Sequence, residues 1–130
     1  MKDFLLFSGS SNLPLASEVA KLLNITLGKV DLTRFADGEL RPWIREDVRD
    51  KTVFVLESFS YPMDEHIMEM VLMGDAIRRG APKTMIAVVP YLGYARQDKL
   101  SRNFLRSVST KRSSPWIFIT MPSSDFSRYR

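Results

Sequence analysis

Short apolar runs alternate with amphipathic segments from the start of the chain to about residue 90. Runs typical of buried strands lie at residues 3–8, 25–31, 52–56 and 84–89. The run at 52–56 is apolar throughout and rich in β-branched and aromatic residues. We therefore expect it at the centre of a sheet that is covered on both faces.

Two segments between these runs have their apolar residues at helical spacing. The first follows Asn12, whose side chain can cap a helix, and it tolerates Pro14 in its first turn. The second opens at Pro62 and ends at Gly80, with acids in its first turn and arginines in its last. Strands and helices in alternation predict parallel pairing with right-handed crossovers. The pattern thus predicts an α/β fold of three layers, with helices flanking a mostly parallel sheet.

An edge hairpin is predicted around residues 35–44. Asp37 and Gly38 form a strong turn signal, and Leu40–Ile44 has the pattern of the second arm. Pro42 within that arm implies an edge position, because proline cannot donate to a sheet. The acids at the tip are explained as solvated turn residues, but a turn does not require a large aromatic such as Phe35.

Two loops that follow predicted strands carry candidate chemistry. Residues 8–11 (Ser-Gly-Ser-Ser) join a strand to a helix N-terminus, a geometry that can receive an anion. A plain capped turn is the favoured interpretation of that loop. Residues 96–98 (Arg-Gln-Asp) follow the apolar strand at 84–89, at the end of a parallel strand where such sheets bind ligands. We interpret residues 88–98 as the rim of a nucleotide site.

Composition and charge exclude some classes of protein but do not indicate a function. The sequence has no cysteine and no apolar run near the roughly eighteen residues of a membrane span, so a cytoplasmic protein is expected. Residues 1–98 carry 12 Lys and Arg against 14 Asp and Glu, whereas residues 99–130 carry 7 against 1. The basic charge belongs to the tail, and nucleic acid is not an expected partner. His66, the single histidine, is expected at the surface of the second helix.

Residues 4–98 resemble the N-terminal domain of ribose-phosphate diphosphokinase, also called phosphoribosyl pyrophosphate synthetase. Two specific motifs carry the resemblance: Arg-Phe-Ala-Asp-Gly-Glu at 34–39 and Pro-Tyr-Leu-Gly-Tyr-Ala-Arg-Gln-Asp at 90–98. Shorter matches lie at 7–9, 27–30, 48–49, 68–70 and 75–76. The resemblance implies a phosphoribosyltransferase-like fold, and it covers less than half of a complete enzyme of that family.

The family transfers pyrophosphate from ATP to ribose 5-phosphate with Mg²⁺ and leaves AMP. By this resemblance, Arg96, Gln97 and Asp98 belong to the ATP site. Arg96 and Gln97 would hold the adenine and its phosphates, and Asp98 would either contact the ligand or orient Arg96 or Lys99. Phe35 would stack on the other face of the base, donated by a neighbouring subunit. The tip residues Asp37, Gly38 and Glu39 would bond to the base. The resemblance therefore implies an ATP site that is complete only in a homo-oligomer.

The chain departs from the family after about residue 102. Residues 101–130 contain no glycine, one acid and eight serines, so we divide the chain into a family-like domain at 1–100 and an atypical basic, Ser-rich tail. The family strand ending in Asp-Leu-His, whose histidine helps bind metal, is absent, and we expect no metal ligand and no catalytic residue here. One hypothesis is an out-of-frame tail from about residue 103, accompanied by a deletion or a gene-model artefact. If the tail is genuine, residues 116–121 can add one strand.

Two functions follow from these expectations. The first is the ATP-binding half of a ribose-phosphate diphosphokinase that is inactive alone, since phosphoryl-type transfer needs both substrates and metals positioned together. Ribose 5-phosphate would then bind only in the complete enzyme. The alternative is a non-catalytic regulatory or assembly partner of complete subunits.

Overall fold

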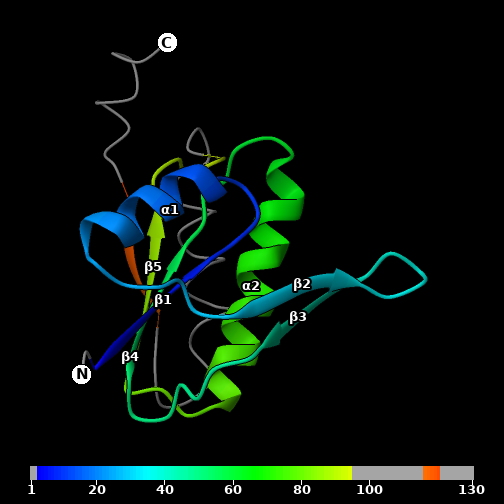
Figure 1. The fold of residues 1–130 in the computed structure, drawn as a ribbon. Coiled ribbons are helices and arrows are strands. Elements are labelled where there is room, and N and C mark those ends of the chain that lie inside the picture. The colour runs from blue at the N-terminus through cyan, green and yellow to red at the C-terminus, as the bar shows by residue number, and fades with distance from the viewer. Residues whose placement is uncertain (1–2, 95–115, 121–130) are drawn as a thin grey trace, which may run out of the picture.

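A four-stranded parallel sheet forms the centre of the structure (Figure 1). The computed structural model describes residues 3–94 and 116–120. The sheet has the order β1-β4-β5-β6, formed by β1 (Phe4–Ser8), β4 (Thr52–Leu56), β5 (Thr84–Val89) and β6 (Trp116–Thr120). The run at 52–56 is therefore an inner strand, as predicted, and the tail does add a strand.

Two helices cover the two faces of this sheet, which confirms the predicted three layers (Figure 1). Helix α1 (Leu13–Leu22) packs over Leu6 and Leu56, and Ala16 is its buried contact. Helix α2 (Met63–Arg79) lies over the opposite face. Asn12 caps α1 through its side-chain oxygen, which accepts from the Leu15 amide at 3.1 Å.

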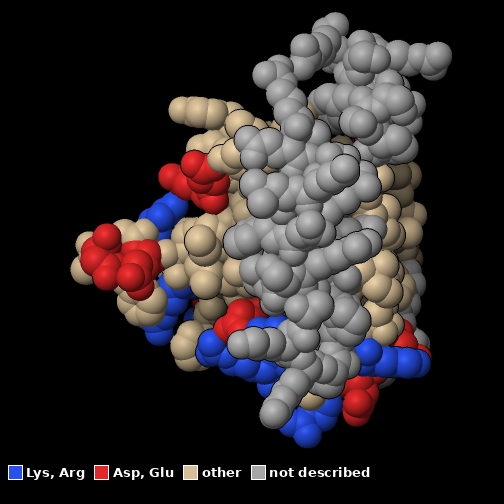
Figure 2. Space-filling view, turned by 180° about the vertical axis from the view of Figure 1, so that it is seen from behind, with Lys and Arg blue, Asp and Glu red and all other residues tan. Residues whose placement is uncertain are grey.

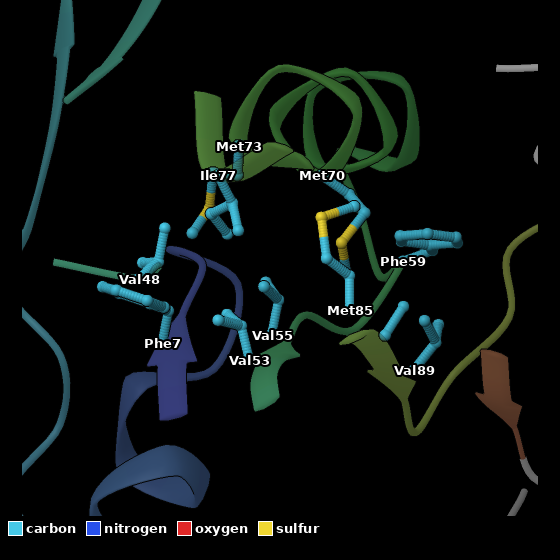
Figure 3. Packing of buried hydrophobic residues seen from close by; sticks show 11 residues of the cluster. Phe7, Val48, Val53, Val55, Phe59, Met70, Met73, Ile77, Met85 and Val89 are labelled. Atoms are coloured by element: carbon cyan, nitrogen blue, oxygen red, sulfur yellow. The ribbon is translucent and has the colours of Figure 1, made fainter. Parts of the chain in front are cut away.

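The larger core lies between α2 and the sheet (Figure 3). Met70, Met73 and Ile77 of α2 are at most 1% exposed. They share one cluster with Phe7, Val48, Val53, Val55, Phe59, Met85, Ala87 and Val89. Alternate residues of β5 enter this cluster, as expected for a strand whose side chains alternate between two buried faces.

A separate antiparallel hairpin is formed by β2 (Val30–Arg34) and β3 (Leu40–Ile44). Pro42 pairs with Leu32 in a ladder of only two strands, which agrees with its predicted edge position. The predicted strand at 25–31 is wrong in its first five residues. Ile25 and Leu27 pack with the α1-side cluster instead, and the chain is pinned there by the Gly28 amide, which donates to the Leu6 carbonyl at 2.7 Å.

His66 is buried, so its predicted surface position was wrong. Its Nδ1 lies 2.8 Å from the carbonyl oxygen of Ser60, in the connection that precedes α2. The turn of α2 that carries it faces this connection, where a backbone acceptor is available. In the parts of the chain that the structure describes, no helix has the length and apolar character needed to cross a bilayer.

Candidate functional site

The hairpin tip holds four of the predicted site residues in a defined turn. The Phe35 amide donates to the Glu39 carbonyl at 2.9 Å, and the Gly38 amide donates to the Phe35 carbonyl at 3.0 Å. Gly38 has φ +93°, a conformation that favours glycine, and an added Cβ would meet nothing within 4 Å. Asp37 accepts from the Glu39 amide at 3.1 Å. The tip is therefore shaped by its own hydrogen bonds and not by packing.

Arg34 ties the tip to the rest of the hairpin and to α2. Its Nη1 donates to the Gly38 carbonyl at 2.6 Å, and its Nη2 lies 3.3 Å from the Glu65 carboxylate. The inner face of the hairpin packs on the core through Leu32 and Ile44. The stem is thus anchored, whereas the tip projects past α2, away from the sheet (Figure 1).

Aromatic and cationic side chains alternate on the outer face of the hairpin. Arg41 lies over the rings of Phe35 and Trp43, at 5.2 and 5.5 Å, and Arg45 lies over the ring of Trp43 at 5.4 Å. Phe35 and Trp43 are each 49% exposed. Acidic side chains gather at the projecting end (Figure 2). The tip therefore presents a half-exposed aromatic ring, with Arg41 over it, beside the exposed carboxylates of Asp37 and Glu39.

The segment that follows β5 is fixed against the connection between β4 and α2. The Phe59 amide donates to the Tyr91 carbonyl at 2.8 Å, and the Tyr94 hydroxyl donates to Asp64. That hydrogen bond raises the pKa of Tyr94. A Cβ on Gly93 would lie 2.7 Å from the Phe59 carbonyl oxygen, so only glycine allows this approach. Arg96, Gln97 and Asp98 lie outside the described residues, and their pairing with Phe35 stays a prediction.

Sequence reasoning missed a second polar cluster, formed by Glu57 and Glu69. Glu57 follows β4 directly and is 0% exposed, and Glu69 lies on the buried face of α2 at 5%. The Ser10 amide and hydroxyl donate to Glu69 at 2.6 and 2.9 Å, and the Ser11 amide donates to Glu57 at 3.2 Å. These two carboxyls occupy the amides of the loop at 8–11, which supports the plain capped turn over an anion site.

The signal for this cluster was present in the sequence. Glu69 falls at helical spacing with Met70, Met73 and Ile77, the residues that fill the core. Glu57 comes directly after an apolar strand. Burial raises the pKa of Glu57 to about 9, and the hydrogen bond and charge of Glu69 add to this effect.

Comparison with known proteins places this fold in a family. Residues 4–114 match the family model described as the N-terminal domain of ribose phosphate pyrophosphokinase. This match runs past residue 100, where we predicted the end of the family-like domain. That domain boundary stays a prediction.

Individual relatives agree with the family match. The ribose-phosphate pyrophosphokinase of Coxiella burnetii is 47% identical over 109 residues, which cover 84% of this chain and 34% of the relative. The ribose-phosphate pyrophosphokinase of Brucella melitensis is 53% identical over 94 residues, which cover 72% of this chain and 30% of the relative. The chain therefore spans about a third of the length of these relatives.

A solved structure shows the same architecture. The crystal structure of phosphoribosylpyrophosphate synthetase from Mycobacterium smegmatis superposes with a TM-score of 0.78 at 28% identity, over 92% of this chain and 49% of that one. The fold, which is a parallel sheet between two helical layers, and the sequence matches indicate the same family. This chain belongs to the family of the N-terminal domain of ribose phosphate pyrophosphokinase.

Proposed function

We propose that this chain supplies the ATP-binding half of a ribose-phosphate pyrophosphokinase, the transferase that forms phosphoribosyl pyrophosphate and AMP from ATP and ribose 5-phosphate. The observation that carries the proposal is the hairpin tip, where a half-exposed Phe35 stands beside Asp37 and Glu39. An exposed ring can stack on a purine, and carboxylates can accept from its exocyclic amine.

The tip is preorganised for this task. Arg34 already holds the Gly38 carbonyl, and the Glu39 amide already holds the Asp37 carboxylate. Little conformational freedom is therefore lost when a base binds. Arg96 and Gln97 would contact the opposite face of the base and its phosphates. An arginine suits both contacts because its guanidinium is planar and permanently charged. Asp98 would orient a neighbouring basic side chain.

The two halves of this site would come from different copies of the chain. Figure 1 shows the hairpin tip projecting past α2 and away from the sheet, whereas Arg96 and Gln97 follow Tyr94, whose hydroxyl donates to Asp64 in the first turn of α2. A tip that projects away from the sheet is suited to reach a neighbouring subunit. The proposal therefore includes a homo-oligomer in which Phe35 of one chain completes the site of another.

Mg²⁺ would enter as the counter-ion of the ATP phosphates. Within residues 3–94 and 116–120, no three His, Asp or Glu side chains are grouped so that they could hold an ion. When bound with ATP, Mg²⁺ would neutralise charge on the phosphates. The chain's own residues would hold the base. A cytoplasmic location, expected from the sequence, belongs to the same proposal.

Calorimetric titration of the 130-residue chain with Mg·ATP tests the site. Phe35→Ala and Arg96→Ala should each lower the affinity at least tenfold, because each removes one stacking face. Trp43→Ala is the matched control, since Trp43 is equally exposed on the same hairpin and also contacts Arg41. Equal affinity in all four proteins would refute the ATP half-site.

A second assay separates the catalytic and assembly roles. The chain with ATP, Mg²⁺ and ribose 5-phosphate should release no AMP, because groups that position ribose 5-phosphate belong to the remaining part of the family enzyme. AMP release above the no-protein rate would contradict this part. If ATP does not bind but the chain co-elutes with a complete relative, the non-catalytic assembly partner becomes the better description.

A further inference from the structure

Two buried carboxyl groups meet where the loop at 8–11, the end of β4 and α2 converge. Glu57 is wholly buried and Glu69 nearly so. The loop binds both of them through its amides and through the Ser10 hydroxyl. The Ser11 hydroxyl in turn accepts from the Ser58 amide at 2.9 Å. The two carboxyls therefore join three segments that are distant in the sequence.

The described residues provide no cation for this pair. Neither carboxyl forms an ion pair with any lysine, arginine or histidine in residues 3–94 or at 116–120. Glu57 Oε2 is buried and has no hydrogen-bond partner if both groups are ionised. Two buried negative charges side by side would be strongly unfavourable, because burial removes their hydration and each repels the other.

The space around Glu57 decides what neutralises the pair. A Cβ built on Gly9 would lie 1.1 Å from Glu57 Oε2 and 2.1 Å from its Cδ, so the carboxyl fills the place of a side chain at Gly9. The Glu57 amide is held by the Val88 carbonyl at 3.0 Å, which fixes the backbone beneath it. Within residues 3–94 and 116–120, no third His, Asp or Glu joins this pair in a group that could hold a metal ion. A proton between the two carboxyls would neutralise the pair and give Glu57 Oε2 a hydrogen bond.

We propose that Glu57 keeps its proton and donates it in a hydrogen bond to Glu69, and that this pair acts as a pH-sensitive latch, which holds the loop at 8–11 onto α2. In the closed state the Glu57 carboxyl donates to Glu69, and this bond supplies the missing partner of Glu57 Oε2. Loss of the proton leaves two carboxylates that repel, and the loop separates from α2. This inference is drawn from Glu57, Glu69 and the loop at 8–11, and it does not rest on the proposed ATP site.

The groups around the latch are consistent with a proton-controlled contact. Burial and the neighbouring Glu69 of α2 raise the pKa of the Glu57 carboxyl, and their effect outweighs that of the hydrogen bonds from Ser11 of the loop, which lower it. From β5, the contact is the Val88 carbonyl. His66 lies one turn before Glu69 on α2, and its Nδ1 is engaged by the Ser60 carbonyl. Thus the described residues around Glu57 favour its protonated form.

Infrared difference spectroscopy of the 130-residue chain at neutral pH tests the proton directly. The wild-type chain should show the carbonyl stretch of a buried protonated carboxylic acid, and Glu57→Gln should lose it. Glu18→Gln on α1, an exposed site, should retain it. A folded wild-type chain without that band at neutral pH would overturn the proposal, and this measurement does not depend on whether a variant folds.

Hydrogen exchange then tests the coupling of the proton to the loop. The protection of the Ser10 and Ser11 amides, corrected for intrinsic rates, should fall at least tenfold in the wild-type chain between pH 7 and about pH 10. In Glu57→Gln, whose amide can donate to Glu69 at any pH, protection should remain constant. Equal pH dependence in both chains would contradict the latch. So would a Mg²⁺-induced rise in protection that is present in the wild type and absent in the variant.

Discussion

The contact between Gly9 and Glu57 makes the sharpest structural prediction. Gly9→Ala would place a methyl group 1.1 Å from Glu57 Oε2, so the carboxyl must leave its position. Its departure breaks the 3.2 Å hydrogen bond from the Ser11 amide and the contact with Glu69. Each buried polar group left unsatisfied costs about 1–3 kcal/mol, and overpacking adds a similar amount. We expect Gly9→Ala to lower the free energy of unfolding by about 3 kcal/mol.

A double-mutant cycle measured by urea unfolding isolates this contact. In a Glu57→Ala background the methyl group has room, so Gly9→Ala should cost less than about 1 kcal/mol, giving a coupling of about 2 kcal/mol. Gly38→Ala is the control, because its cost of about 1–2 kcal/mol comes from backbone strain at φ +93° and should be the same in both backgrounds. Additive effects of Gly9→Ala and Glu57→Ala would refute the geometry of the cluster.

Three further changes test the core, the α1 cap and the pH linkage. Met73→Ala, at a fully buried site, should lower the free energy of unfolding by about 2–5 kcal/mol, whereas Met68→Ala, which is half exposed, should change it by less than about 0.5 kcal/mol in the same urea assay. Asn12→Ala should cost about 1 kcal/mol through loss of the α1 cap, and exposed Ser17→Ala should cost less; equal losses would contradict the cap. Because the pKa of Glu57 is raised from 4.5 to about 9 in the folded chain, wild-type stability relative to Glu57→Gln should be highest below pH 4.5. It should then fall by at most about 1.4 kcal/mol per pH unit and level off above about pH 9; a rise across this window would contradict the assignment.

The sequence predicts the layers of this fold well because its buried elements carry redundant signals. The runs at 52–56 and 84–89 became β4 and β5 with the same bounds. They are short, apolar and flanked by turn residues, which leaves no other regular structure open to them. Helix α2 has a proline at its start, a glycine at its end and an apolar face between, and each signal supports the others.

The sequence predictions were wrong where the local pattern allows two structures equally and tertiary packing decides between them. Ile25 and Leu27 suit a strand, yet they pack with the α1-side cluster because the backbone at Gly28 bonds to β1. The apolar strand before Glu57 favours its burial, but the partner that satisfies its carboxyl, the Ser11 amide, lies 46 residues away in the sequence. His66 is buried through its contact with the Ser60 carbonyl, which the periodicity of its own helix does not encode.

The candidate site is predictable only in part for the same reason. Phe35 was identified because a turn does not explain an aromatic residue, and the structure places it exposed at the hairpin tip. Its proposed partners Arg96 and Gln97 lie outside the described residues, after β5 and the segment to Tyr94. Whether two copies of the chain combine them is a property of the assembly, which a single chain's sequence pattern does not contain.

Mixing two variants that bind ATP weakly tests the shared ATP site most directly. Phe35→Ala lacks one face of the proposed site and Arg96→Ala lacks the other, so each alone should bind Mg·ATP at least tenfold more weakly than the wild type. If each site takes Phe35 from one chain and Arg96 from another, an equimolar, co-refolded mixture should recover about a quarter of the wild-type sites by random assembly. Calorimetric stoichiometry measures this fraction. Recovery of about a quarter of the sites is the predicted result, and a mixture that binds no more Mg·ATP than its separate components would contradict the shared site.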